Sequence, residues 1–198
     1  YERYFDFEDI YTEGITKITP EDMEYAAKLG RTIKLLGTSR RLADGTCYAM
    51  VAPFMLGQNS PLYSVNDVFN AVFVHGNVLG DAMFYGSGAG KLPTASAVVA
   101  DVVDEAKHLH RNIMTMWKNE KLELLPIEDT EKRFFVRISG DEKMRREETE
   151  AAFGAVTFVR AEGLENEFGI ITEVMTEGAY RKIAEKFEGI LHMIRVEE

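Results

Sequence analysis

The last third of the sequence carries an alternation of structural signals that few folds can satisfy. From about residue 132, four short runs rich in β-branched and aromatic residues are separated by two charged runs with helical spacing. The β-prone runs are RFFVRIS, AVTFVRAEG, FGIITEVMT and LHMIRVE, and the helical runs cover about residues 142–153 and 177–188. The predicted order is strand, helix, strand, strand, helix, strand, which is the split β-α-β arrangement.

One helix near the start of the chain has clear signals at both ends. Thr19 precedes Pro20, and Asp22 stands at the third helical position, as in a capping box. Gly30 supplies a residue that tolerates the left-handed backbone with which many helices end. We therefore predict a helix over residues 20–29.

Four further β-prone runs lie between Thr32 and Tyr85. The first two, TIKLLGTSRR and TCYAMVAPFML, flank the hairpin signal Asp44-Gly45, and NAVFVHGN and GDAMFYGS follow. We predict an α+β fold class, with a mostly antiparallel four-stranded sheet and helices over residues 1–124. A ferredoxin-like βαββαβ domain is then expected over residues 125–198. A helical run from Pro93 to Lys121 precedes this second domain.

The charge balance excludes several classes of partner. The chain has 33 acidic and 23 basic residues, and its net charge of -10 disfavours nucleic acid and anionic membranes. No apolar run approaches the roughly 20 residues that a membrane helix needs. The single cysteine, Cys47, cannot form an intrachain disulfide. We expect a cytoplasmic protein.

Individual motifs for metal, thiol or phosphate chemistry are weak. Aligning GSGAGKLPT with a P-loop puts Tyr85 at the first glycine and Leu92 at the magnesium-binding hydroxyl, so a nucleoside triphosphatase is rejected. Glu105 and His108 are three residues apart on a predicted helix, but no third ligand is apparent, and we predict no metal site. Nothing basic stands next to Cys47, so a buried, unreactive thiol is expected.

Three stretches, taken together, resemble homoserine dehydrogenase. They are IYTEGITKITPEDMEYAAKLGRTIKLL at 10–36, NSPLYSVNDVFNAVFVHGNVLGDAMFYGSGAG at 59–90 and PTASAVVADVVD at 93–104. The resemblance is close over about residues 9–105. It implies residues 1–124 to be part of a substrate-binding and dimerisation domain, in a homodimer or a higher homo-oligomer.

The resemblance implies a reaction and a division of labour. Homoserine dehydrogenases interconvert a small-molecule substrate, L-homoserine, and aspartate 4-semialdehyde with NAD or NADP, on the route to threonine, methionine and isoleucine. In the family the catalytic lysine and acidic substrate ligands lie just upstream of the matching stretch, so no catalytic residue is assigned here. No G-x-G-x-x-G opens a βα unit in this chain. We therefore expect a carboxyl-terminal fragment that is inactive by itself.

Two glycines are candidate cofactor contacts by the same resemblance. Gly90 matches a position whose backbone lies beside the bound nucleotide, and Gly88 is a weaker candidate in the same loop. Glycines let backbone approach a ligand, and a helix start favours anionic groups. The structural alternative is a tight strand-to-helix turn that needs positive φ. Both interpretations can hold at once.

The terminal module resembles an ACT domain, which implies threonine as a possible effector. That family places an Asp-x-Pro-Gly-type turn after the first strand, whereas residues 139–143 here read Ser-Gly-Asp-Glu-Lys. The module could therefore keep its fold as a structural or dimer-forming part without sensing an amino acid. The alternative function for the whole chain is a non-catalytic amino-acid-binding or assembly module.

Overall fold

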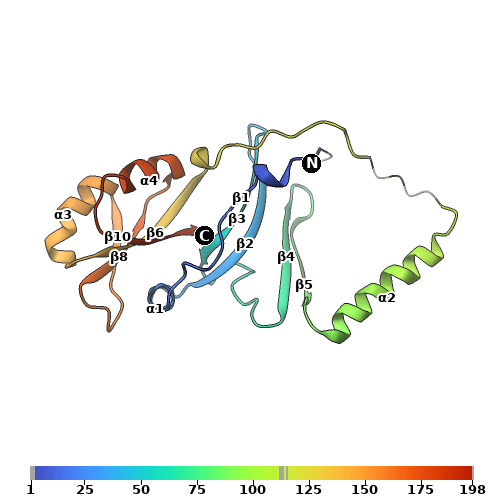
Figure 1. The fold of residues 1–198 in the computed structure, drawn as a ribbon, viewed down its shortest axis with the longest axis horizontal. Helices are drawn as coiled ribbons and strands as arrows, with labels where there is room; N and C mark the ends of the chain where they lie inside the picture. Colours follow the sequence, from blue (N-terminus) through green and yellow to red (C-terminus); the bar gives the residue numbers. More distant parts are fainter. Residues whose placement is uncertain (1–2, 112–113, 115, 198) are drawn as a thin grey trace. The chain divides into compact units, whose positions relative to one another are not determined.

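The computed structural model describes residues 3–111, 114 and 116–197, which fall into two compact units (Figure 1). Unit 1 takes in residues 3–57 and 119–197, and unit 2 takes in residues 58–118. Unit 1 therefore joins the two ends of the sequence, which requires many long-range contacts.

Unit 1 is built on one mixed sheet. Within the described residues, eight strands form this sheet: six follow one another along it, and two pair with single strands at the side. The strands are β1 (Tyr11–Thr12), β2 (Thr32–Arg41), β3 (Cys47–Leu56), β6 (Glu131–Ser139), β7 (Val156–Val159), β8 (Glu167–Thr172), β9 (Met175–Thr176) and β10 (Ile190–Glu197). The helices are α1 (Pro20–Lys28), α3 (Glu142–Phe153) and α4 (Glu177–Ala184), with short 3-10 turns η1 (Phe7–Asp9) and η2 (Ile127–Asp129).

The first helix has the predicted limits. α1 begins at Pro20, and the Thr19 N–H donates to the Asp22 carboxylate at 2.9 Å, which is one half of the predicted capping box. Gly30 follows the helix with φ of 64°, and the Arg31 N–H returns to the Ala26 carbonyl at 2.8 Å. The capping residues thus fix both ends of the helix.

The predicted four-stranded sheet over residues 32–85 is wrong. β2 and β3 do form the expected antiparallel hairpin, but β3 then pairs in parallel with β1 and with β10 from the end of the chain. The strand is buried along most of its length, which suits an interior place in the sheet. Hairpin signals report neighbours in sequence, so they could not reveal that β10 fills the other side of β3.

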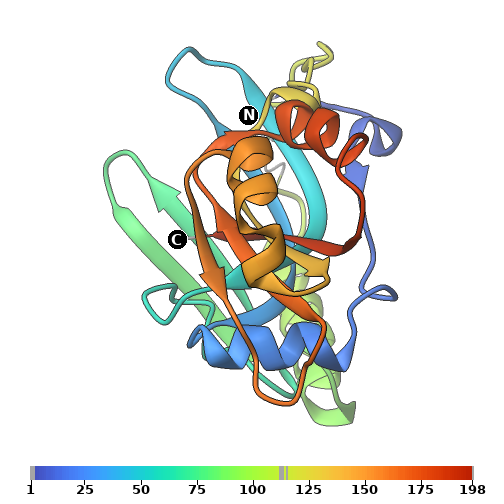
Figure 2. The ribbon, with the colours of Figure 1, turned by 90° about the vertical axis from the view of Figure 1, so that its left-hand side faces the viewer.

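The βαββαβ order of the C-terminal part is confirmed. Its strands lie in the order β10-β6-β8-β7, and α3 and α4 lie together against one face of them (Figure 2). This part is not a separate sheet, however, because β10 also pairs in parallel with β3. The boundary near residue 124 falls inside unit 1 and does not coincide with the compact division. As a boundary between domains of a longer protein it stays a prediction.

Period-two alternation along β6 produces two hydrophobic cores. Phe134, Val136 and Ile138 face α3 and α4, where they join Phe168 and Ile170. Phe135 faces the opposite way, toward Tyr25 and Ala26 of α1, with Ile194 and Val196 of β10 beside it. The sheet is therefore covered on both faces, by the C-terminal helices on one and by α1 on the other.

Unit 2 contains β4 (Phe69–Gly76), β5 (Gly80–Ser87) and α2 (Lys91–Lys107). β4 and β5 form a two-stranded antiparallel sheet of their own. The sequence predicts a single helix from Pro93 to Lys121. The observed helix ends at Lys107 and is followed by a turn, in which His110 has a φ of 62°. Residues 112, 113 and 115 lie outside the described residues. No helix in the described part of the chain is long and apolar enough to cross a membrane.

Candidate functional site

The glycine-rich loop of unit 2 joins β5 to α2. Gly90 is the residue that immediately precedes the helix, with φ of 115° and ψ of 152°, and its carbonyl accepts from the Thr94 N–H at 3.1 Å. No side chain caps the helix start, and its first turn contains no acidic residue. The residues from Gly86 to Gly90 are all exposed. Open amide groups at a helix start are suited to an anionic group.

Gly88 lies close to the side chain of Asn70 at the start of β4. A Cβ built on Gly88 would lie 1.6 Å from the Asn70 side-chain nitrogen and 2.7 Å from its Cγ. The Gly88 N–H donates to the Val68 carbonyl at 3.2 Å. The loop is thus held against the start of β4 by a backbone hydrogen bond, and a side chain at position 88 would require the exposed Asn70 side chain to move.

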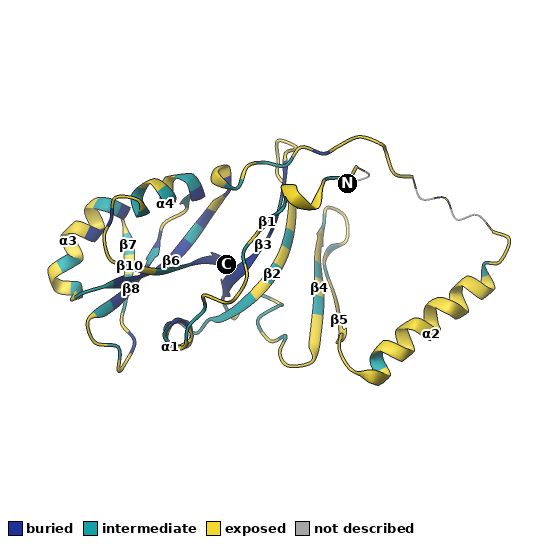
Figure 3. Cartoon of the chain, in the orientation of Figure 1, coloured by how far each residue is buried: buried dark blue, intermediate teal, exposed yellow. Residues whose placement is uncertain are grey.

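The helix that follows the loop presents an apolar surface. No residue of α2 is buried, and Figure 3 shows the helix in the colour of exposed residues except at its first turn, where Pro93 is intermediate. Its exposed apolar side chains are Leu92, Val98, Val99, Val102 and Val103. Valines at adjacent and helically spaced positions are typical of a surface that another layer of protein covers.

In unit 1, a buried guanidinium joins three distant elements. Arg195 of β10 is 1% exposed, and its Nε and Nη2 donate to the two carboxylate oxygens of Glu177 at 2.8 and 2.7 Å. Its Nη1 donates to the Glu13 carboxylate at 2.7 Å. Glu177 is the first residue of α4, and Glu13 follows β1. The Tyr11 ring lies 5.0 Å from the Arg195 guanidinium.

The charges in this cluster are balanced. Arg181 donates to Glu177 at 2.8 Å, so two guanidinium groups face the carboxylates of Glu177 and Glu13. Burial acts to raise the pKa of the Glu13 carboxyl, but the hydrogen bond and charge of Arg195 outweigh it and hold that pKa below its usual value. Glu13 is therefore ionised at neutral pH.

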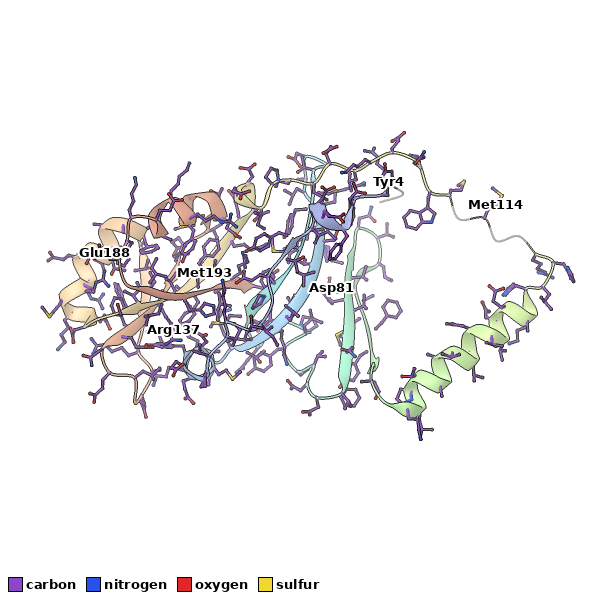
Figure 4. The ribbon with its side chains drawn as sticks, viewed as in Figure 1. Tyr4, Asp81, Met114, Arg137, Glu188 and Met193 are labelled. Atoms are coloured by element: carbon purple, nitrogen blue, oxygen red, sulfur yellow. The ribbon has the colours of Figure 1, made fainter. Side chains whose placement is uncertain are left out.

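A second buried guanidinium lies on the opposite face of the sheet. Arg137 of β6, labelled in Figure 4, donates through Nε and Nη2 to Glu167 at 3.1 and 3.0 Å. Its Nη1 donates to Thr19 Oγ1 at 2.8 Å and to Asp22 Oδ1 at 2.9 Å. The Asp22 Oδ2 atom lies 2.8 Å from His192 Nδ1.

Asp22 is a buried carboxylate with several partners. Burial acts to raise its pKa, but hydrogen bonds from His192, from the Thr19 backbone and from Arg137 outweigh burial and lower that pKa below the usual value. The residue that caps α1 is thus also the residue that ties this helix to β6 and β10.

A pocket of about 390 Å³ lies at the end of the C-terminal sheet. Its lining comes from the turn between β6 and α3 and from the loop between β7 and β8. The charged lining residues include Glu142, Arg160, Glu165 and Glu167. The lining is mainly acidic, because Asp141 adds a fourth carboxylate and the arginine of the lining, Arg160, already donates to Glu142 at 2.7 Å.

The comparisons with known proteins now decide the family. A family model for homoserine dehydrogenase matches residues 1–103, which is more than half of the chain. The chain belongs to the homoserine dehydrogenase family. The homoserine dehydrogenase of Bacillus subtilis is 42% identical over 109 residues, covering 54% of this chain and 25% of the relative. That of Helicobacter pylori is 38% identical over 138 residues, covering 69% of this chain and 32% of the relative.

Solved homoserine dehydrogenases extend the likeness to nearly the whole chain. The crystal structure from Thiobacillus denitrificans matches with a TM-score of 0.75 at 31% identity, covering 98% of this chain and 48% of that one. The Staphylococcus aureus enzyme at pH 7.0 matches with a TM-score of 0.73 at 25% identity, covering 98% and 49%. This chain therefore spans about half the length of the solved homoserine dehydrogenases.

The other candidates from the sequence are placed as follows. His108 contacts Asp104 on its own helix, with Nδ1 2.8 Å from the Asp104 carbonyl. No group of three potential metal ligands gathers among the residues that the structure describes. Cys47 is buried, as expected. The roles of Gly90 and Gly88 toward a cofactor stay predictions.

Sequence reasoning missed both buried arginine clusters. Arg137 and Arg195 stand in the β-prone runs RFFVRIS and LHMIRVE, flanked on both sides by apolar residues. A charged residue on a strand that is buried on both faces must meet a counter-charge, and that signal was available. The partners Glu13 and Asp22 are too distant in sequence to be found that way.

Proposed function

We propose that this chain forms the carboxyl-terminal part of a homoserine dehydrogenase, which interconverts L-homoserine and aspartate 4-semialdehyde with NAD or NADP. The observation that carries the proposal is the family match across residues 1–103, together with the likeness of 98% of the chain to about half of a solved homoserine dehydrogenase. We expect the enzyme to work in the cytoplasm, where the single cysteine stays reduced.

The glycine loop is the part of this chain that we assign to the cofactor. The loop fits such a ligand because the start of α2 lacks a side-chain cap and an acidic residue, and because residues 86–90 are exposed. Backbone N–H groups beside Gly90 would hold an anionic part of the cofactor, and Gly88 keeps the loop closed against Asn70. When bound, NAD or NADP supplies the hydride acceptor for the oxidation of L-homoserine.

We propose that the remaining chemistry belongs to the part of the relatives' length that this chain does not match, since the chain covers about half of the solved homoserine dehydrogenases. The chain contains no G-x-G-x-x-G, and by resemblance the catalytic lysine precedes residue 9. The exposed valines of α2 are the surface that such an upstream half would cover. We therefore propose that the chain alone binds neither substrate nor cofactor productively.

We also propose that two copies of the chain associate, in a homodimer or a higher homo-oligomer. In the β4–β5 hairpin, Val72 and Phe84 are paired on one face while Phe69 and Tyr85 stack at 4.9 Å on the other. A two-stranded sheet with apolar residues on both faces needs cover on both. Sedimentation of the chain over a range of concentrations tests this association.

An effector role for the ACT-like part is the second candidate function. The observation that favours it is the pocket at the β6–α3 turn, whose acidic lining suits the ammonium group of an amino acid such as threonine. A thermal shift of this chain with L-threonine, absent with D-threonine, would support an amino-acid-binding module. Unchanged melting at millimolar L-threonine would leave the module with a structural role.

Reduction of NAD⁺ or NADP⁺ with L-homoserine tests the main proposal. The assay is run on this chain and on the same chain joined to its upstream half. We expect the joined protein to reduce cofactor and this chain to be silent. Activity of the joined protein with no added L-homoserine, or no activity with it, would overturn the dehydrogenase proposal and favour the binding module.

A further inference from the structure

Two arginines fasten the C-terminal strands to the beginning of the chain in the same way. Each directs Nε and Nη2 to a glutamate of its own C-terminal part, Glu177 for Arg195 and Glu167 for Arg137. Each then directs Nη1 to an acidic residue of the amino-terminal segment, residues 9–30. The two arrangements are independent, because they use different strands and helices.

The two arginines act from opposite faces of the sheet. Arg195 neighbours Phe134 in register, on the face that α3 and α4 cover, whereas Arg137 points with Phe135 toward α1. The segment is therefore held at Glu13 on one side and at Asp22 on the other. Attachments on two faces oppose both sliding and rotation of the segment against the sheet.

The segment makes few backbone contacts with the sheet near Glu13. β1 has two residues in register with β3, and the Glu13 N–H donates to the Val51 carbonyl at 2.7 Å. So short a strand is marginal by itself. Tyr25 and Ala26 of α1 hold the later part of the segment in the hydrophobic core, so the Arg195–Glu13 pair acts mainly on the stretch before α1. A buried ion pair adds little net stability compared with apolar residues of the same volume, and its better attested contribution is a defined geometry.

We propose that Arg195 and Arg137 are positioning residues that lock the amino-terminal segment onto the C-terminal strands, so that the C-terminal part sets the geometry of the enzyme's catalytic half. The consequence for catalysis rests on the proposed function, in which the catalytic lysine lies just upstream of residue 9. The lock itself rests only on the contacts of unit 1. The C-terminal part is then an integral support of the active site.

Hydrogen exchange on the 198-residue chain tests the lock. Glu13→Gln removes the charge that Arg195 faces and keeps the shape, and Glu128→Gln is the matched control, because the Glu128 carboxylate meets Arg181 at 2.8 Å on the surface. We expect the Glu13 amide to exchange about tenfold faster or more in Glu13→Gln, as for loss of a charge-assisted hydrogen bond, with Ile170 in β8 unchanged. The control leaves the Glu13 amide at the wild-type rate.

A second variant changes the arginine of the Arg195–Glu13 pair in place of the carboxylate. Arg195→Lys cannot serve Glu177 and Glu13 together, so it is expected to reproduce the faster exchange, with Arg133→Lys on β6 as its control. If Arg195→Lys does not fold, Glu13→Gln decides. Equal exchange in Glu13→Gln and Glu128→Gln would overturn the lock, as would faster exchange spread evenly over β6, β8 and β10.

The catalytic consequence is measured on the chain joined to its upstream half. Well below the unfolding temperature, Glu13→Gln should lower kcat about tenfold while the KM for L-homoserine changes little, because a misplaced catalytic group slows the chemical step. An unchanged kcat, with faster exchange, would overturn the positioning role. If the joined wild-type protein shows no homoserine-dependent reduction, the proposed function fails, and the exchange experiment still decides the lock.

Discussion

The Arg195 guanidinium and the Glu13 carboxylate meet at 2.7 Å across 182 positions of the sequence. Glu13 belongs to the TEGI stretch that carries the family resemblance, and Arg195 belongs to the last strand. The pair therefore joins the part of the chain that resembles a substrate domain to the part that resembles a sensor module. The parallel pairing of β10 with β3 makes the same connection through the backbone.

Acid should weaken unit 1 through the half-buried carboxylate of Glu13 and the buried carboxylate of Asp22. The folded-state pKa values of Glu13 and Asp22 are lower than their ordinary values of 4.5 and 3.8. Their ionisation therefore stabilises the fold above those ordinary values, and this contribution is lost as the pH falls through the lowered pKa values. Urea midpoints measured from pH 7 to pH 3 should fall steeply below about pH 4.5.

Replacing the better buried carboxylate makes this prediction specific. Asp22→Asn should lose about 3 kcal/mol at pH 7, because it leaves Arg137 without one of its counter-charges. The loss relative to wild type should shrink toward pH 3. Glu24→Gln, on the exposed side of the same helix, is the control and should change little. A constant difference between Asp22→Asn and wild type at every pH would contradict the assignment.

In the glycine loop, alanine should be tolerated better at position 86 than at position 88. Gly88→Ala places its Cβ where the exposed Asn70 amide lies, so Asn70 must change its side-chain conformation, at a cost of about 0.5–1.5 kcal/mol. Gly86→Ala meets nothing within 4 Å and should be nearly neutral. Thermal unfolding of the two variants distinguishes them. Asn70→Ala should rescue Gly88→Ala, and failure of that rescue would mean that the penalty has another origin.

The sequence predicted elements better than it predicted their partners. Thr19, Asp22 and Gly30 set the limits of α1, since capping depends on neighbours along the chain. The β-branched and aromatic residues of RFFVRIS likewise predicted the strand that is observed as β6. The pairing of β3 with β10 joins Phe54 to Arg195, and no local pattern encodes a contact at that separation. The end of α2 at Lys107 was missed because the helical pattern continues beyond it.

In the candidate site, too, the sequence shows local features but not the contacts between elements. The glycines that form the loop before α2 are visible in the sequence, and Gly90 has the positive φ that a tight turn needs. The contact of Gly88 with Asn70 was not predictable, because it depends on the register of β4 against β5. Arg137 and Arg195 are visible in the sequence as charges within apolar runs. Their acidic partners lie in other elements, so the clusters were not predicted.

A buried hydroxyl offers a stabilising substitution. Tyr25 is fully buried, and its hydroxyl meets no partner with good hydrogen-bond geometry among the described residues, although the Glu167 carboxylate is near enough to act on it. Burial, with the nearby Glu167 charge, raises the pKa of Tyr25 to about 12. Tyr25→Phe removes the unpaired polar group and keeps the ring beside Phe135, so stability should rise by about 1 kcal/mol. A urea midpoint below that of wild type would show that the hydroxyl has a partner in solution.

Gly90→Ala separates the two roles proposed for the loop. The backbone of Gly90, at φ 115° and ψ 152°, lies in a region that other residues occupy only with strain, at a cost of about 1–3 kcal/mol. The substitution should therefore lower the melting temperature of this chain through the turn alone. In the chain joined to its upstream half, it should also raise the KM for the cofactor, while the KM for L-homoserine changes less. Gly88→Ala with Asn70→Ala is the control for a perturbed but unstrained loop. If Gly90→Ala lowers the melting temperature and leaves the cofactor KM unchanged, Gly90 serves the turn and the cofactor contact must be sought elsewhere.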